Sequence, residues 1–244
     1  AMRMRLGWSC MGRAFSRAQG RLQRRRLRHR ADGMDAPCPD PFNLAAYVLQ
    51  AGARDPGKVA LAVLGPARAE RWSYARLIRA VEGMAGALRA AGFAPGDRLL
   101  FRIGNTVEFP VAFLGAVAAG LVPVPTAAAL TEGEVTRLAR LVAPAAVLAG
   151  PGIALPEIDA PVLTDLRAMM EAPPGGYETG PPDRLAYLVF TSGSSGEAKA
   201  VAHAHRAIWA RRMMHEGWYG LRPDDRLLHA GAFNWTFTLG TGLL

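Results

Sequence analysis

One short run of the chain gathers hydroxyl groups, glycines and a lysine. It reads Thr191-Ser192-Gly193-Ser194-Ser195-Gly196, and Lys199 follows. Glycines let successive backbone N–H groups turn toward one anion, hydroxyls donate hydrogen bonds to phosphate oxygens, and a lysine adds positive charge. Residues 34–244 hold 17 arginines but only two lysines, Lys58 and Lys199, so composition alone does not account for a lysine here. These are the requirements of a polyphosphate-binding site.

Two other interpretations of this run fit its spacing and surroundings less well. The common NTPase loop places Lys directly after the last Gly and Ser or Thr after Lys. Here Glu197 and Ala198 intervene, and Ala200 follows the lysine. A Gly/Ser linker would have polar neighbours, whereas apolar, strand-like segments flank this run on both sides. We therefore favour a phosphate site of a different type.

The elements around this run predict an α/β fold with layered sheets, because helical and strand-like stretches alternate from Asp40 onward. We expect strands over residues 59–64, 98–103, 121–124, 146–149 and 185–190, with one short strand near Val162. We expect helices over residues 42–50, 73–92, 109–119, 131–142 and 206–216. The remainder of residues 151–182, rich in Pro and Gly, is expected to be irregular. The last predicted strand leads directly into the hydroxyl-rich run.

Capping residues mark four of the helix starts. Single caps precede the first two helices, and two pairs have the spacing of a capping box. These are Asn43, Ser73, Asn105 with Glu108, and Thr131 with Glu134.

A charge-free stretch of 22 residues, 109–130, is long enough to span a bilayer. However, Gly115, Gly120, Pro123 and Pro125 interrupt it, and proline removes a backbone donor that lipid cannot replace. We therefore predict a buried helix followed by a strand, and no membrane span.

The hydroxyl-rich run resembles the phosphate-binding signature of the adenylate-forming (AMP-binding) enzymes, a superfamily of acyl- and aryl-CoA synthetases, peptide-synthetase adenylation domains and luciferases. Their signature reads Thr-Ser-Gly-Ser/Thr-Thr-Gly-x-Pro-Lys-Gly-Val. In this chain Ser195 keeps the hydroxyl, and Ala198 and Ala200 replace Pro and Gly. Residues 96–105 and 115–125 are similar to a recurring strand–helix–strand block of the superfamily. The chain looks most like its benzoate-CoA ligase type.

The resemblance implies that a carboxylic acid attacks ATP, with Mg²⁺, to give an acyl-adenylate, which coenzyme A then takes up. It implies that Thr191, Ser192, Gly193, Ser194, Ser195, Gly196 and Lys199 bind the β- and γ-phosphates, and Lys199 is the candidate catalytic residue. An adenylation domain that loads a carrier protein is the alternative within the superfamily. A non-catalytic protein that binds nucleotide or nucleic acid is the alternative outside it.

The superfamily builds its acyl pocket near the end of this chain, so the resemblance nominates Phe233, Asn234, Trp235 and Phe237 as pocket residues. The three aromatic residues alternate, so they would share one face of a strand. Ordinary core packing is the other interpretation of each. Aromatic walls suit an aryl or a short- or medium-chain acid.

His203 and His205 also alternate, as two metal ligands on one strand face would. No third ligand with suitable spacing follows, so we predict no metal site.

The positive charge of the chain lies in its first 33 residues. They hold ten arginines and one acid, whereas residues 34–244 hold 19 basic and 19 acidic residues. A basic arm binds nucleic acid or anionic membranes, and an Arg-rich leader targets organelles. A start assigned upstream of Met34 is the third interpretation. The body itself predicts no nucleic-acid partner.

We therefore divide the chain into a leader, residues 1–33, and part of an AMP-binding domain, residues 34–244. The superfamily's adenine loop, ribose-binding aspartate and mobile C-terminal subdomain would lie beyond Leu244, so we expect this portion to be inactive and to aggregate alone. With only two cysteines, Cys10 and Cys38, and no secretory signal, we expect a cytoplasmic protein.

Overall fold

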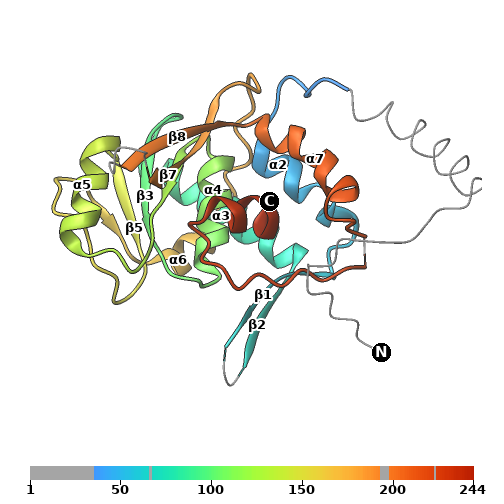
Figure 1. Ribbon diagram of the computed structural model, residues 1–244, viewed down its shortest axis with the longest axis horizontal. Helices are drawn as coiled ribbons and strands as arrows, with labels where there is room; N and C mark the ends of the chain where they lie inside the picture. Colours follow the sequence, from blue (N-terminus) through green and yellow to red (C-terminus); the bar gives the residue numbers. More distant parts are fainter. Residues whose placement is uncertain (1–35, 66–67, 193–197, 223) are drawn as a thin grey trace, which may run out of the picture. The chain divides into compact units, whose positions relative to one another are not determined.

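The computed structural model describes residues 36–65, 68–192, 198–222 and 224–244 (Figure 1). Its internal contacts divide the chain into residues 1–37 and 38–244, and the second unit carries all the elements below. The arginine-rich segment 1–33 lies outside the described residues.

A four-stranded parallel sheet forms the centre of the second unit. Its strands are β3 (Arg98–Arg102), β4 (Val122–Pro125), β5 (Ala146–Ala149) and β6 (Val162–Leu163), in the order β4-β3-β5-β6. Leu100 of β3 pairs with Val124 and Val147 on its two neighbours. These four strands lie where the sequence predicted them, and the predicted α/β fold is confirmed.

Helices cover both faces of this sheet because its strands alternate their side chains. Leu99 and Phe101 pack in one cluster with α3 (Tyr74–Ala90) and α4 (Glu108–Ala118). Leu100, whose side chain points to the opposite face, packs in a second cluster with α5 (Glu132–Val142). In Figure 1, α5 accordingly lies apart from α3 and α4, with the sheet between them.

Three of the four predicted caps form. Asn43 Oδ1 accepts hydrogen bonds at the start of α2 (Leu44–Leu49), and Ser73 caps α3. Thr131 and Glu134 make a complete capping box at α5. Gly92, after α3, has φ +89°, the left-handed conformation that ends helices.

The fourth predicted cap is wrong. Helix α4 begins after Val107 without a side-chain cap. Asn105 instead bonds to a segment 126 to 128 residues further on. Local spacing favoured a cap, but a distant backbone segment competes for the same amide group.

Helix α6 (Leu166–Met170) and strand β2 (Ala69–Ser73) are among the elements that were not predicted. Helix α6 lies inside the stretch expected to be irregular, capped by Asp165. Strand β2 pairs with the predicted β1 (Val59–Leu64) in an antiparallel hairpin that projects from the body (Figure 1). A helix of five residues is too short for hydrophobic periodicity to reveal. A strand that reads Ala-Glu-Arg-Trp-Ser has little apolar alternation.

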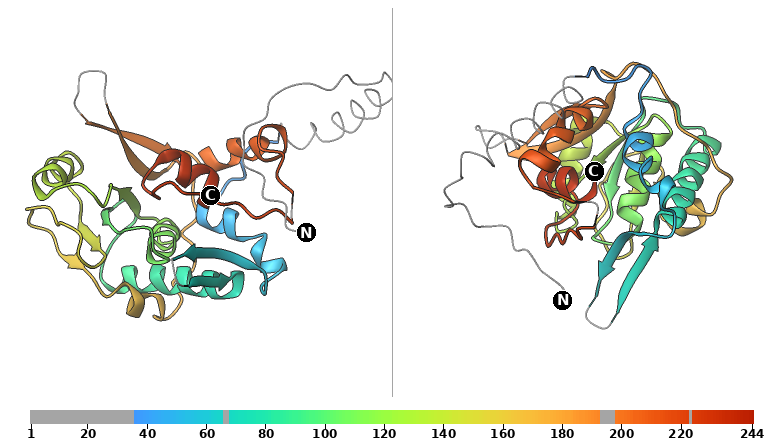
Figure 2. Two further views of the ribbon diagram at one scale, coloured as in Figure 1. Left: turned by 60° about the horizontal axis from the view of Figure 1, so that its bottom comes forward. Right: turned by 90° about the vertical axis from the view of Figure 1, so that its right-hand side faces the viewer.

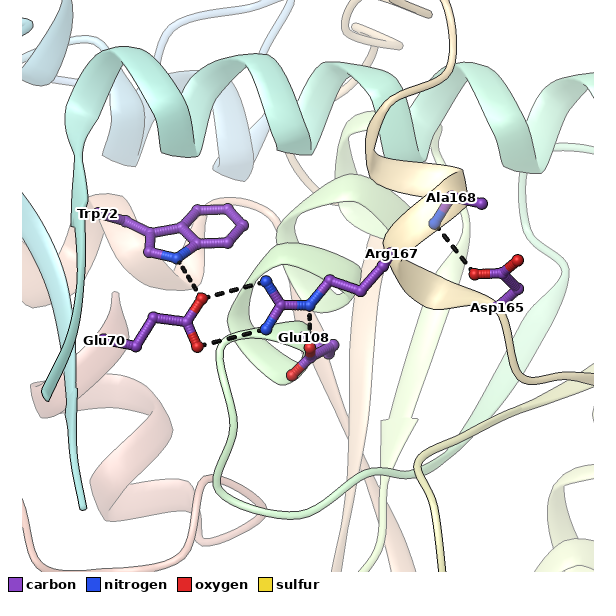
Figure 3. A network of polar contacts seen from close by, with 6 residues as sticks. All are labelled: Glu70, Trp72, Glu108, Asp165, Arg167 and Ala168. Atoms are coloured by element: carbon purple, nitrogen blue, oxygen red, sulfur yellow. Dashed lines mark hydrogen bonds and ion pairs between the residues drawn. The ribbon is translucent and has the colours of Figure 1, made fainter. Parts of the chain in front are cut away.

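A polar network fastens this hairpin to the body (Figure 3). Arg167 of α6 donates two hydrogen bonds to Glu70 of β2 and one to Glu108 of α4. Trp72, only 2% exposed, donates its indole N–H to Glu70 at 2.8 Å. Arg167 lowers the pKa of Glu70, which keeps that carboxylate charged.

Most of the remaining elements lie in the C-terminal third of the chain. Strands β7 (Leu185–Ser192) and β8 (Ala198–Ala204) form an antiparallel hairpin. They are followed by α7 (Ala207–Gly217) and a π-helical turn, η2 (Thr238–Leu243). A 3₁₀ turn, η1 (Gly52–Arg54), follows α2 near the other end of the unit.

Among the described residues, no helix is both long and apolar enough to cross a bilayer. The charge-free stretch 109–130 instead forms α4 and β4, as predicted.

Candidate phosphate-binding hairpin and acyl pocket

The hydroxyl-rich run joins the two strands of the β7–β8 hairpin. Thr191 and Lys199 are direct partners across the hairpin, and Ser192 pairs with Ala198. Gly193, Ser194, Ser195 and Gly196 lie outside the described residues. Opposing residues of an antiparallel pair share one face, and both Thr191 and Lys199 are exposed. The structure thus places a hydroxyl and an ammonium group together where the loop begins and ends.

The middle of strand β7 is buried on both faces, and this burial anchors the hairpin in the body. Tyr187 and Val189, both 1% exposed, pack with the α4 cluster. Leu188 packs with β4 and α5 on the other face. The apolar run predicted this burial, and Figure 2 shows the hairpin extending from the body beyond these contacts.

The end of the hairpin away from the loop carries a stacked pair of rings. Tyr187 and His203 lie 4.5 Å apart with nearly parallel planes, and Phe113 of α4 meets Tyr187 edge-on. Arg211 Nη1 of α7 donates a hydrogen bond to the Tyr187 hydroxyl at 3.4 Å. Burial raises the pKa of Tyr187, although Arg211 opposes this. Burial and the charge of Arg211 both lower the pKa of His203.

His205 has different surroundings from His203. It follows the end of β8, is 1% exposed, and accepts a hydrogen bond at Nδ1 from the Leu44 N–H at 3.0 Å. Burial and the nearby charge of Arg184 lower the pKa of His205 to about 4. In the part of the chain that the structure describes, no three His, Cys, Asp or Glu side chains gather as a metal site would require.

The aromatic segment near the C-terminus is not a strand. Residues 233–235 form a turn and residues 236–243 are helical. Backbone N–H groups of Trp235 and Leu239 bond within the segment, to Ala232 and Trp235. The strand predicted from the alternation of three aromatic residues is therefore wrong. These backbone groups form local hydrogen bonds instead of pairing with a second strand.

The three aromatic side chains consequently do not share one face. Phe233 stacks on Phe109 of α4 at 5.2 Å, and its N–H donates to Asn105 Oδ1 at 3.0 Å. Trp235 and Phe237 are 66% and 63% exposed.

A cavity of about 340 Å³ lies between α7 and this segment. Helix α7 contributes Arg211, Met214 and His215, and the segment contributes Thr236 and Phe237. Of the four nominated pocket residues, only Phe237 lines this cavity; Phe233, Asn234 and Trp235 do not. Phe233 instead packs against the core.

Sequence reasoning missed two side chains that shape the surroundings of these sites. Asn105 holds the segment before the cavity, as described above. Arg102, at the carboxyl end of β3, is fully buried and donates to four backbone carbonyls in the loops after β4 and β5. Burial lowers the pKa of Arg102. The sequence did carry a signal for Arg102, because a charged residue at the end of a buried apolar strand needs hydrogen-bond partners.

Comparisons with known proteins agree with this architecture. Residues 48–244 match the family model described as AMP-binding enzyme. The chain is 26% identical over 198 residues to a 3-hydroxybenzoate–CoA/4-hydroxybenzoate–CoA ligase of Thauera aromatica, covering 70% of this chain and 37% of that protein. It matches the ATP-bound structure of MatB from Rhodopseudomonas palustris with a TM-score of 0.72 and 27% identity, covering 83% of this chain and 42% of that one.

The nonribosomal peptide synthetase FmoA3 is also similar, with a TM-score of 0.68 and 27% identity over 82% of this chain and 21% of that one. The chain therefore spans less than half the length of each of these three proteins. The family model covers most of the chain, including the β7–β8 hairpin and its hydroxyl-rich run. The chain belongs to the AMP-binding enzyme family of adenylate-forming enzymes.

Proposed function

We propose that the protein activates a carboxylic acid with ATP and transfers the acyl group to coenzyme A. The observation that carries this proposal is the pairing of Thr191 with Lys199 across the hairpin that bears the hydroxyl-rich run. Similarity to a hydroxybenzoate–CoA ligase and to an ATP-bound structure supports it.

The chemistry has two steps. A carboxylate oxygen attacks the α-phosphorus of ATP, the bond to the bridging oxygen breaks, and pyrophosphate leaves with that electron pair. The thiol of coenzyme A then attacks the acyl carbon and loses its proton, and AMP departs.

The residues of the hairpin fit the first step because negative charge grows on the departing pyrophosphate. Lys199 supplies a cation and Thr191 a hydroxyl donor for the β- and γ-phosphates, and Ser192, Gly193, Ser194, Ser195 and Gly196 would supply the remaining donors. Groups held in place before the reaction stabilise such charge most effectively. Mg²⁺ bound to ATP adds positive charge there when it is present.

The cavity beside α7 is the proposed site of the acid. Its volume suits a single aromatic ring or a short chain, and Met214 and Phe237 give it apolar walls. We therefore propose an aryl or a short- or medium-chain acid as the substrate.

A carrier protein in place of coenzyme A is the second candidate, and similarity to a nonribosomal peptide synthetase favours it. Offering the adenylate both a free thiol and a phosphopantetheinyl carrier distinguishes the two acceptors. A nucleic-acid-binding role for residues 1–33 is a separate hypothesis, which deletion of that segment tests: lost binding would support it.

The first step is tested by ATP–pyrophosphate exchange in the intact protein with a panel of carboxylic acids. Lys199→Ala should lower the exchange rate about 100- to 1,000-fold, as the loss of one preorganised donor typically does. Lys58→Ala removes the same charge outside the hairpin and serves as the matched control. Equal rates for Lys199→Ala and Lys58→Ala would refute the assignment of Lys199.

A further inference from the structure

The proposed acid cavity contains an arginine whose hydrogen-bonding capacity is largely unused. A guanidinium carries five N–H donors. Among the described residues, Arg211 makes one hydrogen bond, to the Tyr187 hydroxyl, at the long distance of 3.4 Å, and no ion pair. Met214 and Phe237, which also line the cavity, offer Arg211 no acceptor, and the polar lining residues His215, Tyr219 and Thr236 make no hydrogen bond to it among the described residues.

We propose that Arg211 binds an oxygen-bearing substituent of the acid, either a hydroxyl or a second carboxylate, at the end away from the reacting carboxylate. This inference rests on the proposed function. Arg211 would thus be the residue that selects among acids.

The position of Arg211 along the hairpin determines which end of the acid it meets. Its partner Tyr187 precedes Thr191 by four residues in β7. Strands rise about 3.4 Å per residue, so Tyr187 lies roughly 14 Å from Thr191 along the strand. The reacting carboxylate must reach the α-phosphate beside the loop. A group that contacts Arg211 therefore belongs to the far end of the acid.

The chemistry of the surrounding groups favours an oxygen substituent. Arginine binds carboxylates through two parallel hydrogen bonds and hydroxyl oxygens through one. Thr236 and Tyr219 also line the cavity and bring two hydroxyl groups to it. An apolar acid would leave the remaining N–H donors of Arg211 without a partner in a partly desolvated cavity, which costs binding energy.

A glycine leaves room for this guanidinium. A Cβ atom added at Gly240 of η2 would lie 2.4 Å from Arg211 Nη1. Gly240→Ala therefore displaces the guanidinium without changing its charge. This substitution tests the position of Arg211 separately from its chemistry.

The experiment measures KM and kcat for benzoate, 3-hydroxybenzoate, 4-hydroxybenzoate and benzene-1,4-dicarboxylate by pyrophosphate exchange, and Kd for each acid by calorimetry. In Arg211→Leu, KM for the preferred oxygen-bearing acid should rise at least tenfold, and this factor should exceed the change in KM for benzoate at least threefold. Gly240→Ala should also raise KM for the oxygen-bearing acid relative to KM for benzoate. Arg211→Lys should keep part of the preference, and Arg137→Leu, on α5, is the control for loss of an exposed arginine.

Four outcomes separate the inference from the function on which it rests. A uniform change in KM for all four acids in Arg211→Leu would overturn the selective role of Arg211, as would a wild type indifferent to the substituents. Absence of exchange with any acid would overturn the proposed function. Arg211-dependent calorimetric binding of oxygen-bearing acids without exchange would support the inference and refute that function.

Discussion

Mild acid should weaken the fold through one buried imidazole, that of His205. Its Nδ1 accepts a hydrogen bond from the Leu44 N–H. This N–H lies in the first turn of helix α2, where backbone donors have no acceptor within the helix. Protonation would place an N–H against this N–H and a positive charge near Arg184. The folded state therefore resists protonation, and the pKa of His205 falls to about 4.

The size of the effect follows from this pKa. An unfolded chain binds a proton at the ordinary histidine pKa of 6.5. The stabilisation by neutral His205 is complete above that pH and declines as the pH falls toward 4. Each pH unit within this window costs about 1.4 kcal/mol, so lowering the pH from 7 to 5 should remove about 2 kcal/mol from the free energy of unfolding.

His205→Asn isolates this contribution because asparagine offers an acceptor oxygen in place of Nδ1 but does not titrate. Urea unfolding of both proteins at pH 7 and pH 5 gives the change in free energy of unfolding for each. Wild type should lose about 2 kcal/mol more than His205→Asn over this interval. His205→Ala should be less stable at pH 7 by about 1–3 kcal/mol, because the Leu44 N–H then lacks its partner. Parallel pH profiles for wild type and His205→Asn would refute the reasoning.

Further substitutions test three other contacts. Gly86→Ala should destabilise the protein by about 1–3 kcal/mol, because the added Cβ would lie 1.9 Å from the Pro173 carbonyl oxygen. Gly133→Ala, where nothing lies within 4 Å of the added Cβ, should be neutral or stabilising by up to about 1 kcal/mol. Calorimetric melting measures the stability change for Gly86→Ala and Gly133→Ala, and a change of the same sign in the two variants would contradict the clash at Gly86. Arg102→Met should cost about 3 kcal/mol or more in urea unfolding, since it strips four backbone carbonyls of a donor; a loss below about 1 kcal/mol would contradict this. Asn105→Ala should raise KM for the acid several-fold while Asn105→Asp, which keeps the acceptor for the Phe233 N–H, should not; equal KM values would count against a positioning role.

Local signals predicted the elements that position the hydroxyl-rich run. Continuous apolar residues foretold β3, β5 and β7, and Ser73 and Thr131 cap helices as their spacing indicated. The same signals failed wherever a distant contact decides the outcome. Asn105 has the spacing of a cap, yet its partner is Phe233, 128 residues away.

For the candidate sites, too, the sequence identified residues from a local motif but not the contacts that depend on distant parts of the chain. A linear motif named Thr191 and Lys199, but their direct pairing is a matter of strand register that the motif does not contain. Arg211 drew no attention in the sequence because it is one arginine among many. Its significance arises only from the approach of α7 to Tyr187 and to η2.

The unequal burial of the two hairpin strands has a mechanical consequence. Strand β7 is wedged between two hydrophobic clusters, whereas most residues of β8 are exposed. Strand β8 is held to the body largely through its backbone pairing with β7, which includes the Thr191–Lys199 pair. We expect a triphosphate that contacts Thr191 and Lys199 to be held relative to the body mainly through β7.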